Sequence, residues 1–170
     1  MATGIESIAK TLLSSDALKG IAKATGTSKN DVTSVLTNAL PTLLAGANKQ
    51  TTGAKTAQGF IDALSSHAKT STTDLTSFFK NVDIEDGSKI VGHLLGKTSG
   101  KTAEKAAKNT GVDAAQAAKI LAAAAPLLMS LLGKKTKTAS KKDKEANIAD
   151  IASSLLGSSD VTSLLKGFLK

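Results

Sequence analysis

The sequence predicts an all-α, multihelical protein, and three observations support that fold class. Apolar residues recur at helical spacing through most of the chain, and no stretch alternates apolar and polar residues long enough to indicate a strand. Glycines and capping residues separate the apolar stripes at intervals that suit short helices. The 170 residues are 41% apolar, much of it alanine, which is enough for one ordinary core or two small ones.

The first two helices follow from an apolar stripe and two capping signals. Apolar residues at helical spacing over residues 5–13 predict the first helix, which two serines end. Asp16 is placed to cap a second helix that runs to Thr25. Gly26 can adopt the left-handed conformation that favours a helix C-terminus, so we expect the second helix to stop there.

The third helix begins with a capping box and meets a proline. Ser28 followed by Asp31 matches the capping box, with aspartate in place of the usual glutamate. Pro41 cannot donate a backbone hydrogen bond and crowds the preceding turn, so we expect the helix to kink or restart there. Gly111 and Pro126 repeat this arrangement in the second half of the chain.

Five further helices are predicted, over residues 55–68, 73–81, 88–95, 144–156 and 160–169. Gly53, Gly100 and Gly157 are expected to separate them. Asp83, Glu85 and Asp86 form an acidic segment that we interpret as a loop, whose last acid caps the helix beginning at Ser88. Gly92 and Gly96, four residues apart, are predicted to let another helix approach closely.

An internal duplication is the most informative pattern. Residues 21–44 align with residues 106–129 at an offset of 85, and both prolines of the chain coincide. Residues 74–80 and 160–166 form a weaker second match. We therefore predict two related helical halves, which need not be separate cores. The expected division is a first half over 1–85, the core of the second half over 86–133, a lysine-rich linker over 134–144, and C-terminal helices over 145–170.

Positive charge is concentrated in the second half. All 22 basic residues are lysines, and the formal net charge is +8. Residues 86–170 hold fourteen lysines against seven acids, whereas residues 1–85 are nearly balanced. Six lysines lie within residues 134–144, where no side chain is apolar and larger than alanine, so we interpret this run as a solvated linker. Its lysines could also neutralise nucleic-acid phosphates or anionic lipid headgroups.

Residues 114–132 are apolar enough to raise the question of a membrane. Their polar members are Gln116, Lys119 and Ser130. We favour a buried central helix, because eight of these residues are alanine, Lys119 lies among them and Pro126 divides them.

The corner around Gly26 has helix-turn-helix spacing. A DNA reader of this type would present the start of its second helix to the major groove. The second copy offers Asp113 and two alanines there, and the chain has no arginine for guanine, so tight helix packing is the favoured interpretation. Under the alternative of nucleic-acid binding, the candidate contacts come from the start of this second helix and from the lysine run. They are Ser28, Lys29, Asn30, Lys134, Lys135, Lys137, Lys141, Lys142 and Lys144.

Composition excludes several chemistries. Without cysteine or arginine there is no disulfide, thiolate nucleophile, zinc-cysteine cluster or arginine clamp. His67 and His93 lie 26 residues apart with no nucleophile or third ligand marked by spacing. We interpret His67 as a residue near a helix C-terminus and His93 as a packing or hydrogen-bonding residue. The sequence predicts no catalytic residue, cofactor or metal site, and only a pocket gathering both histidines with carboxylates would favour an enzyme.

Several segments resemble one known family. Residues 86–96 (DGSKIVGHLLG), the alanine-rich segment that follows them, and the block 39–46 (ALPTLLAG) resemble a bacterial domain family of unknown function related to YidB-like proteins. The resemblance covers roughly residues 15–133. It implies an all-helical bacterial protein with a homeodomain-like helical arrangement, and it implies no activity, substrate or site.

The function that we predict is a non-enzymatic helical interaction or scaffold protein. A protein partner or self-association is expected. Nucleic-acid association is the alternative, and the net charge and the helix-turn-helix spacing are the observations that favour it. A membrane-surface role is disfavoured, and no small-molecule substrate is indicated. The first residues lack the continuous apolar core of a secretory signal, so we expect a cytoplasmic protein.

Overall fold

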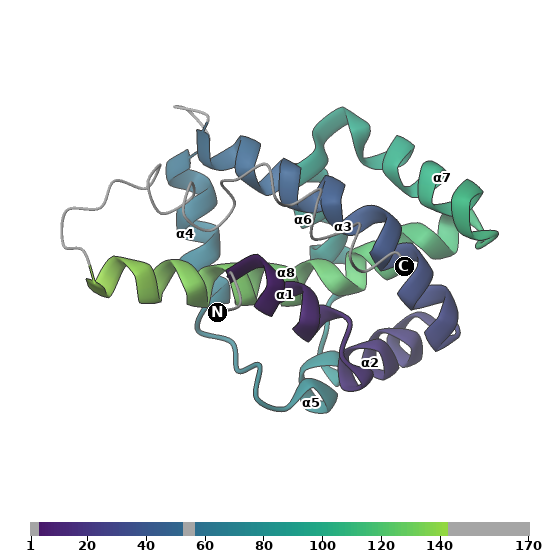
Figure 1. Cartoon of the computed structure of the whole chain (residues 1–170), viewed down its shortest axis with the longest axis horizontal. Helices are drawn as coiled ribbons and strands as arrows, with labels where there is room; N and C mark the ends of the chain where they lie inside the picture. Colours follow the sequence, from purple (N-terminus) through teal and green to yellow (C-terminus); the bar gives the residue numbers. More distant parts are fainter. Residues whose placement is uncertain (1–3, 53–56, 143–170) are drawn as a thin grey trace.

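The computed structural model describes residues 4–52 and 57–142, and it confirms the all-α class. Within those ranges the regular elements are all helical, and Figure 1 shows them gathered around one long helix. In chain order they are α1 (Gly4–Leu12), α2 (Ser15–Thr25), α3 (Lys29–Thr52), α4 (Ala57–His67), α5 (Leu75–Lys80), α6 (Ile84–Leu95), the 3-10 turn η1 (Gly96–Thr98), α7 (Ser99–Thr110) and α8 (Ala114–Lys142).

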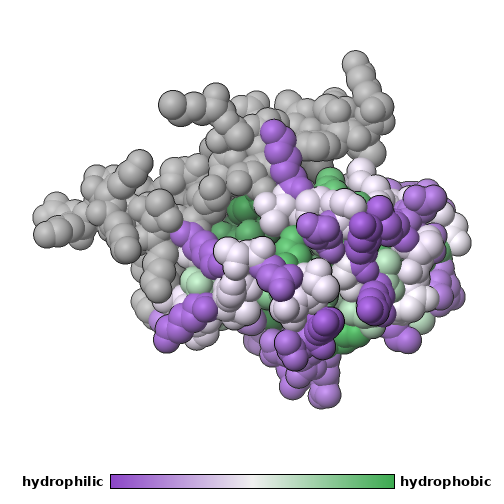
Figure 2. Space-filling view, turned by 90° about the horizontal axis from the view of Figure 1, so that it is seen from below, coloured by the Kyte–Doolittle hydropathy of each residue, from purple (hydrophilic) through white to green (hydrophobic). Residues whose placement is uncertain are grey.

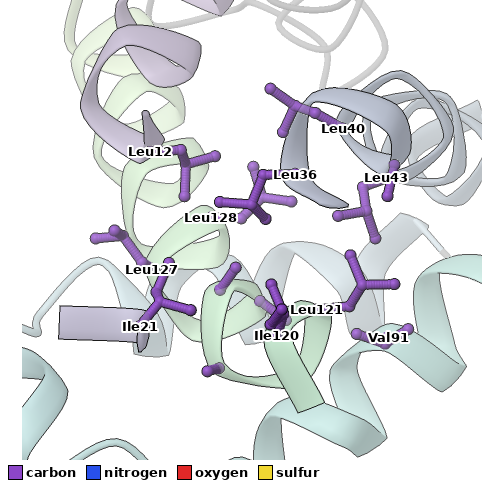
Figure 3. Close-up of a cluster of buried hydrophobic side chains, with 14 of the residues drawn as sticks. Leu12, Ile21, Leu36, Leu40, Leu43, Val91, Ile120, Leu121, Leu127 and Leu128 are labelled. Atoms are coloured by element: carbon purple, nitrogen blue, oxygen red, sulfur yellow. The ribbon is translucent and has the colours of Figure 1, made fainter. Parts of the chain in front are cut away.

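The long helix α8 forms the centre of the core. Helices α1, α2, α3, α4, α6 and α7 all pack on it. Figure 3 shows its Ile120 and Leu128 among side chains from α1, α2, α3 and α6. Every residue from Ile120 to Ser130 is buried, because α8 meets neighbours on all its sides there. Residues of both halves thus belong to one hydrophobic cluster, and neither half has a core of its own.

The apolar stretch of α8 is occupied by protein contacts. Ala114–Lys134 is long and apolar enough to cross a membrane by length and composition. In this fold 72% of its most apolar window is buried against the other helices. The stretch is therefore accounted for as a central core helix.

The first corner, between α2 and α3, largely follows the sequence prediction. Gly26 has φ 69° and donates its N–H to the Ala22 carbonyl, so it ends α2 in the left-handed conformation. The capping box is confirmed, because Ser28 Oγ accepts from Asp31 N at 3.1 Å while Asp31 Oδ2 accepts from Ser28 N at 3.4 Å. The predicted cap at Asp16 is wrong, since Ser14 Oγ accepts the first-turn N–H instead.

The second corner, between α7 and α8, has the same local geometry. Gly111 has φ 76° and donates to the Ala107 carbonyl. Thr110 Oγ1 donates to the carbonyl four residues earlier at 2.7 Å, as Thr25 Oγ1 does at 2.8 Å in the first corner. Asp113 accepts from Ala115 N and caps α8. The same threonine and glycine hydrogen bonds therefore end α2 and α7.

Neither proline interrupts its helix, so the expected restart is wrong. Both α3 and α8 continue through Pro41 and Pro126 without a break. Buried leucines on both sides of each proline hold the two segments in line against the core. Pro126 has no N–H for the Ala122 carbonyl, and Gly87 of α6 lies directly against that oxygen.

Among the described residues, three glycines other than the predicted pair lie directly against a backbone carbonyl of a neighbouring helix. A Cβ at Gly87 would overlap the Ala122 carbonyl oxygen, and a Cβ at Gly133 would overlap the Leu64 carbonyl oxygen. Gly46 of α3 lies similarly against a carbonyl of α6. Gly92 and Gly96 were the wrong candidates, because a Cβ at either would have nothing within 4 Å.

Several predicted boundaries shift. Helix α6 begins at Ile84 instead of Ser88, because Asp83 accepts from the N–H groups of Glu85 and Asp86 and caps it. Gly100 lies inside α7 and separates nothing. The helix expected over 73–81 is shorter, at Leu75–Lys80. Helix α4 ends at His67, one residue before the expected end, and residues 55 and 56 of the expected helix lie outside the described residues.

The lysine-rich segment continues α8. Its backbone is helical through Lys142, so the described part of the predicted linker extends α8, and its role as a solvated linker stays a prediction. Lysine and alanine are good helix formers, and the buried part of α8 already supplies the nucleus from which the helix extends. Gly53, Gly157 and the helices predicted over 144–156 and 160–169 lie outside the described residues.

Candidate binding cleft

Helix α4 places a row of residues along one side of a cleft. Gly59, Phe60, Ala63 and His67 all line it, at positions that recur along one helix face. Phe60 is 8% exposed and Leu64 is 4% exposed, so the neighbouring face of α4 is anchored in the core. The contact between Leu64 and Gly133 holds α4 on α8.

Helix α6 forms the opposite side. Its Ile90, His93 and Leu94 line the cleft at spacings of three and four residues, which place them on one face. The Asp83 cap fixes where α6 starts, and Gly87 fixes how closely it lies on α8. Helices α4 and α6 both pack on α8 much more than on each other, so a groove remains between them.

The cleft between α4 and α6 has a volume of about 320 Å³ and an apolar lining. Met129 of α8 contributes to it, as does Gln50 near the end of α3. Ligand pockets in proteins have volumes of roughly 300–1,000 Å³, so this cleft lies at the lower end of that range. Figure 1 shows α4 beside the C-terminal part of α8.

Three polar side chains lie among this apolar lining. Gln50 Nε2 donates to the His93 carbonyl at 2.9 Å and so ties the end of α3 to α6. His67 is half-buried as the last residue of α4, where a positive charge is favourable, which confirms its predicted place. His93 has an exposed side chain. The structure therefore brings the two histidines to one cleft, and none of the described residues that line it carries a carboxylate.

A second hollow of about 460 Å³ shares His67 and contains the missing acids. Asp74, Asp83 and Asp86 line it, and the carboxylates of Asp74 and Asp83 accept helix-capping N–H groups. The Ser77 hydroxyl donates to Asp74 at 2.7 Å, and this bond holds the pKa of the Asp74 carboxyl below its usual value. Ser130 is fully buried and donates to the Pro126 carbonyl.

Four hydroxyl side chains line the second hollow, those of Thr70, Ser71, Ser77 and Ser130. The Ser77 hydroxyl donates to Asp74, and the Ser130 hydroxyl donates to the Pro126 carbonyl. In the part of the chain that the structure describes, no three His, Asp or Glu side chains are close enough to hold a metal ion. The apolar lining of the α4–α6 cleft suits an apolar group.

The candidate nucleic-acid contacts of the first corner lie at the start of α3. Lys29 and Asn30 are exposed, as a groove-reading helix would require. Ser28 is exposed too, but its hydroxyl serves the capping box. The structure thus leaves two of the three side chains available for an external partner.

The lysine run lies elsewhere. Lys134 is partly buried, and its Nζ donates to Thr72 Oγ1 at 2.7 Å. The backbones of Lys135, Lys137, Lys141 and Lys142 belong to the end of α8, and Lys144 lies outside the described residues. Figure 1 shows the start of α3 and the end of α8 toward opposite ends of the molecule, so they do not form one local patch.

A second group of exposed lysines is not among the contacts predicted from the sequence. Lys97, Lys101, Lys105 and Lys108 are four, four and three residues apart, and all four side chains are exposed. They form a stripe along η1 and α7, which we call the α7 lysine stripe. None of them forms an ion pair with another described residue. The spacing itself was the available signal, hidden by the more conspicuous run at 134–144.

The family described as "Bacterial protein of unknown function (DUF937)" matches residues 8–135. The chain belongs to this family. No curated protein and no solved structure matches it. The resemblance to a bacterial family of unknown function is thereby confirmed, whereas the relation to YidB-like proteins stays a prediction. All the residues that line the α4–α6 cleft lie inside the DUF937 match, so the cleft is part of the family's domain.

Proposed function

We propose that this DUF937 protein is a non-enzymatic interaction module whose α4–α6 cleft receives apolar side chains from a helical segment. The apolar lining of the cleft, between two helices held on α8, is the observation that carries the proposal. A groove between two helices suits an amphipathic helix, whose apolar residues at helical spacing enter it in a row. Among the described residues that line the cleft, the polar side chains are those of Gln50, His67 and His93, and none is a carboxylate or a lysine.

The cleft can be tested with the neutral fluorescent probe N-phenyl-1-naphthylamine. We expect saturable binding of one probe per chain. Gly59 is exposed and a Cβ there would meet nothing within 4 Å, so Gly59→Phe fills the cleft without disturbing the fold. This variant should bind the probe about tenfold more weakly, a difference of about 1.4 kcal/mol.

Gly100→Phe is the matched control for that experiment. Gly100 is also an exposed helical glycine with open space around its missing Cβ, but it lies on α7, outside the cleft lining. Its probe affinity should equal that of the native protein. Equal affinities for all three proteins would show that the probe binds elsewhere and would contradict the proposal.

The α7 lysine stripe supports a second candidate function, association with nucleic acid. Four unpaired ammonium groups on one helix face can lie along a phosphate backbone. Glu104 is exposed on the same helix and limits the net charge there. The two similar corners, which we infer to derive from an internal duplication with a homeodomain-like helical arrangement, add less support, because Ser28 and Asp113 serve as caps.

Binding of a labelled DNA duplex over a salt series tests this candidate. Changing Lys97, Lys101, Lys105 and Lys108 to glutamine should reduce the slope of log K against log salt by about 3.6 if each lysine neutralises one phosphate. The control is the same fourfold change at Lys10, Lys19, Lys23 and Lys69, which are exposed lysines outside the candidate contacts and keep the net charge equal. A parallel loss in both variants would mean that only net charge matters, and the stripe would lose its role.

A further inference from the structure

The proposed cleft requires an occupant that carries apolar side chains on a helix. The structure shows in α5 how a short segment of this chain performs such docking. Asp74 caps α5, and Phe79 is 5% exposed against α2. A Cβ at Gly20 of α2 would overlap the Phe79 ring, so the missing side chain of a helical glycine makes the seat for an apolar residue.

The chain contains a second segment with the same pattern. Residues 160–166 (DVTSLLK) repeat residues 74–80 (DLTSFFK), with aspartate in the capping position and a pair of leucines in place of the phenylalanine pair. Phe168 and Leu169 follow, so that apolar residues recur at positions 161, 164, 165, 168 and 169. That spacing is typical of the apolar face of an amphipathic helix, and such a face needs a partner surface.

The α4–α6 cleft offers the corresponding seat. Gly59 lines it with open space where a Cβ would stand, beside the apolar Phe60 and Ala63. At Gly20 the Phe79 ring occupies the place of the missing Cβ, whereas at Gly59 nothing lies within 4 Å of that place. Gly59 lies in the cleft of about 320 Å³.

The length of chain beyond α8 allows the segment to reach this seat. Lys142 lies thirteen residues beyond Met129, a rise of about 20 Å along α8. The seventeen residues between Lys142 and Asp160 can span about 56 Å when extended, at roughly 3.3 Å per residue. A tethered segment of this kind acts at an effective concentration in the millimolar range, which favours it over a separate copy.

We propose that residues 161–169 of this same chain occupy the α4–α6 cleft, with Leu164, Leu165 and Phe168 directed at Gly59 and Phe60. This inference rests on the proposed function of the cleft. The segment then acts as an internal competitor, and an external partner must displace it to bind. Access to the cleft is regulated by the chain itself.

Engineered cysteine pairs in the full chain test the placement, because the native sequence has no cysteine. Gly59→Cys combined with Leu165→Cys should form an intramolecular disulfide under mild oxidation at low protein concentration. Gly100→Cys with Leu165→Cys is the control, since both glycines are exposed helical positions with open space. Equal yields for the two pairs, no disulfide in either, or disulfide-linked dimers alone would overturn the proposal, the last in favour of a second copy.

Probe binding separates failure of this inference from failure of the cleft. Leu164→Ser, Leu165→Ser and Phe168→Ser together should tighten binding of N-phenyl-1-naphthylamine about tenfold if the segment fills the cleft nine-tenths of the time. If this triple serine variant binds the probe with unchanged affinity, and Gly59→Phe still weakens that binding about tenfold, the internal occupant is overturned and the cleft remains supported. If Gly59→Phe changes the probe affinity in neither the native protein nor the triple serine variant, both the internal occupant and the proposed function of the cleft are overturned.

Discussion

Replacement of Gly87 by alanine is expected to destabilise the protein by about 3 kcal/mol or more, within the upper range for overpacking substitutions. The added methyl would overlap the Ala122 carbonyl oxygen and approach the Pro126 ring. Both obstacles are rigid parts of α8, so the change can be accommodated only if α6 moves away from the core. That movement would also separate Ile90 and Leu94 from α8 and open the α4–α6 cleft.

Urea unfolding followed by circular dichroism measures the effect, and Gly92→Ala is its control on the same helix. A Cβ at Gly92 meets nothing within 4 Å, so this variant should be more stable than the native protein by about 0.5–1 kcal/mol, the usual helical gain. Opposite signs for two Gly→Ala changes five residues apart would establish the close approach of α6 to α8. A stabilised Gly87→Ala variant would refute it.

Truncation of one core residue from each half is expected to give the second large effect. Leu36 of α3 and Ile120 of α8 are both fully buried, and Figure 3 places them in the same cluster. Changing either to alanine should cost about 3 kcal/mol, from lost burial and the cavity left behind. Because both halves contribute to one cluster, each variant should still unfold in a single transition that includes both halves.

Hydrogen exchange of peptides from α3 and from α8 provides the measurement. Protection in both should fall together in Leu36→Ala, and likewise in Ile120→Ala. Thr42→Ala and Lys119→Ala are the controls, since both side chains are exposed on the same two helices and should change stability by less than about 0.5 kcal/mol. Separate transitions for the two halves would mean that each is an independent unit.

Figure 2 illustrates why surface composition alone does not locate the functional site. Hydrophilic side chains cover much of the face seen there, with smaller hydrophobic areas between them. The lysines that drew attention in the sequence, at 134–144, include Lys134, which is engaged with Thr72. The α7 lysine stripe became apparent only once α7 was a continuous helix through Gly100, because its lysines share a face at that spacing.

The candidate cleft was beyond the reach of the sequence for a similar reason. His67 and His93 lie 26 residues apart in the sequence, and their spacing gave no cause to pair them. They share one cleft because α4 and α6 pack side by side on a third helix that follows both in the chain. Contacts of that kind depend on non-local packing, which no periodicity within a single segment encodes.

The sequence by itself determined the helical class, the two glycine corners and the Ser28–Asp31 capping box, because each depends on interactions within a few residues. Tertiary structure decided the rest. It kept α3 and α8 continuous through their prolines, because burial on both sides outweighs one lost hydrogen bond. It also selected Gly87 over Gly92 as the contact glycine. The neighbouring helix determines which glycine must lack a side chain, and the local sequence around a glycine does not indicate that contact.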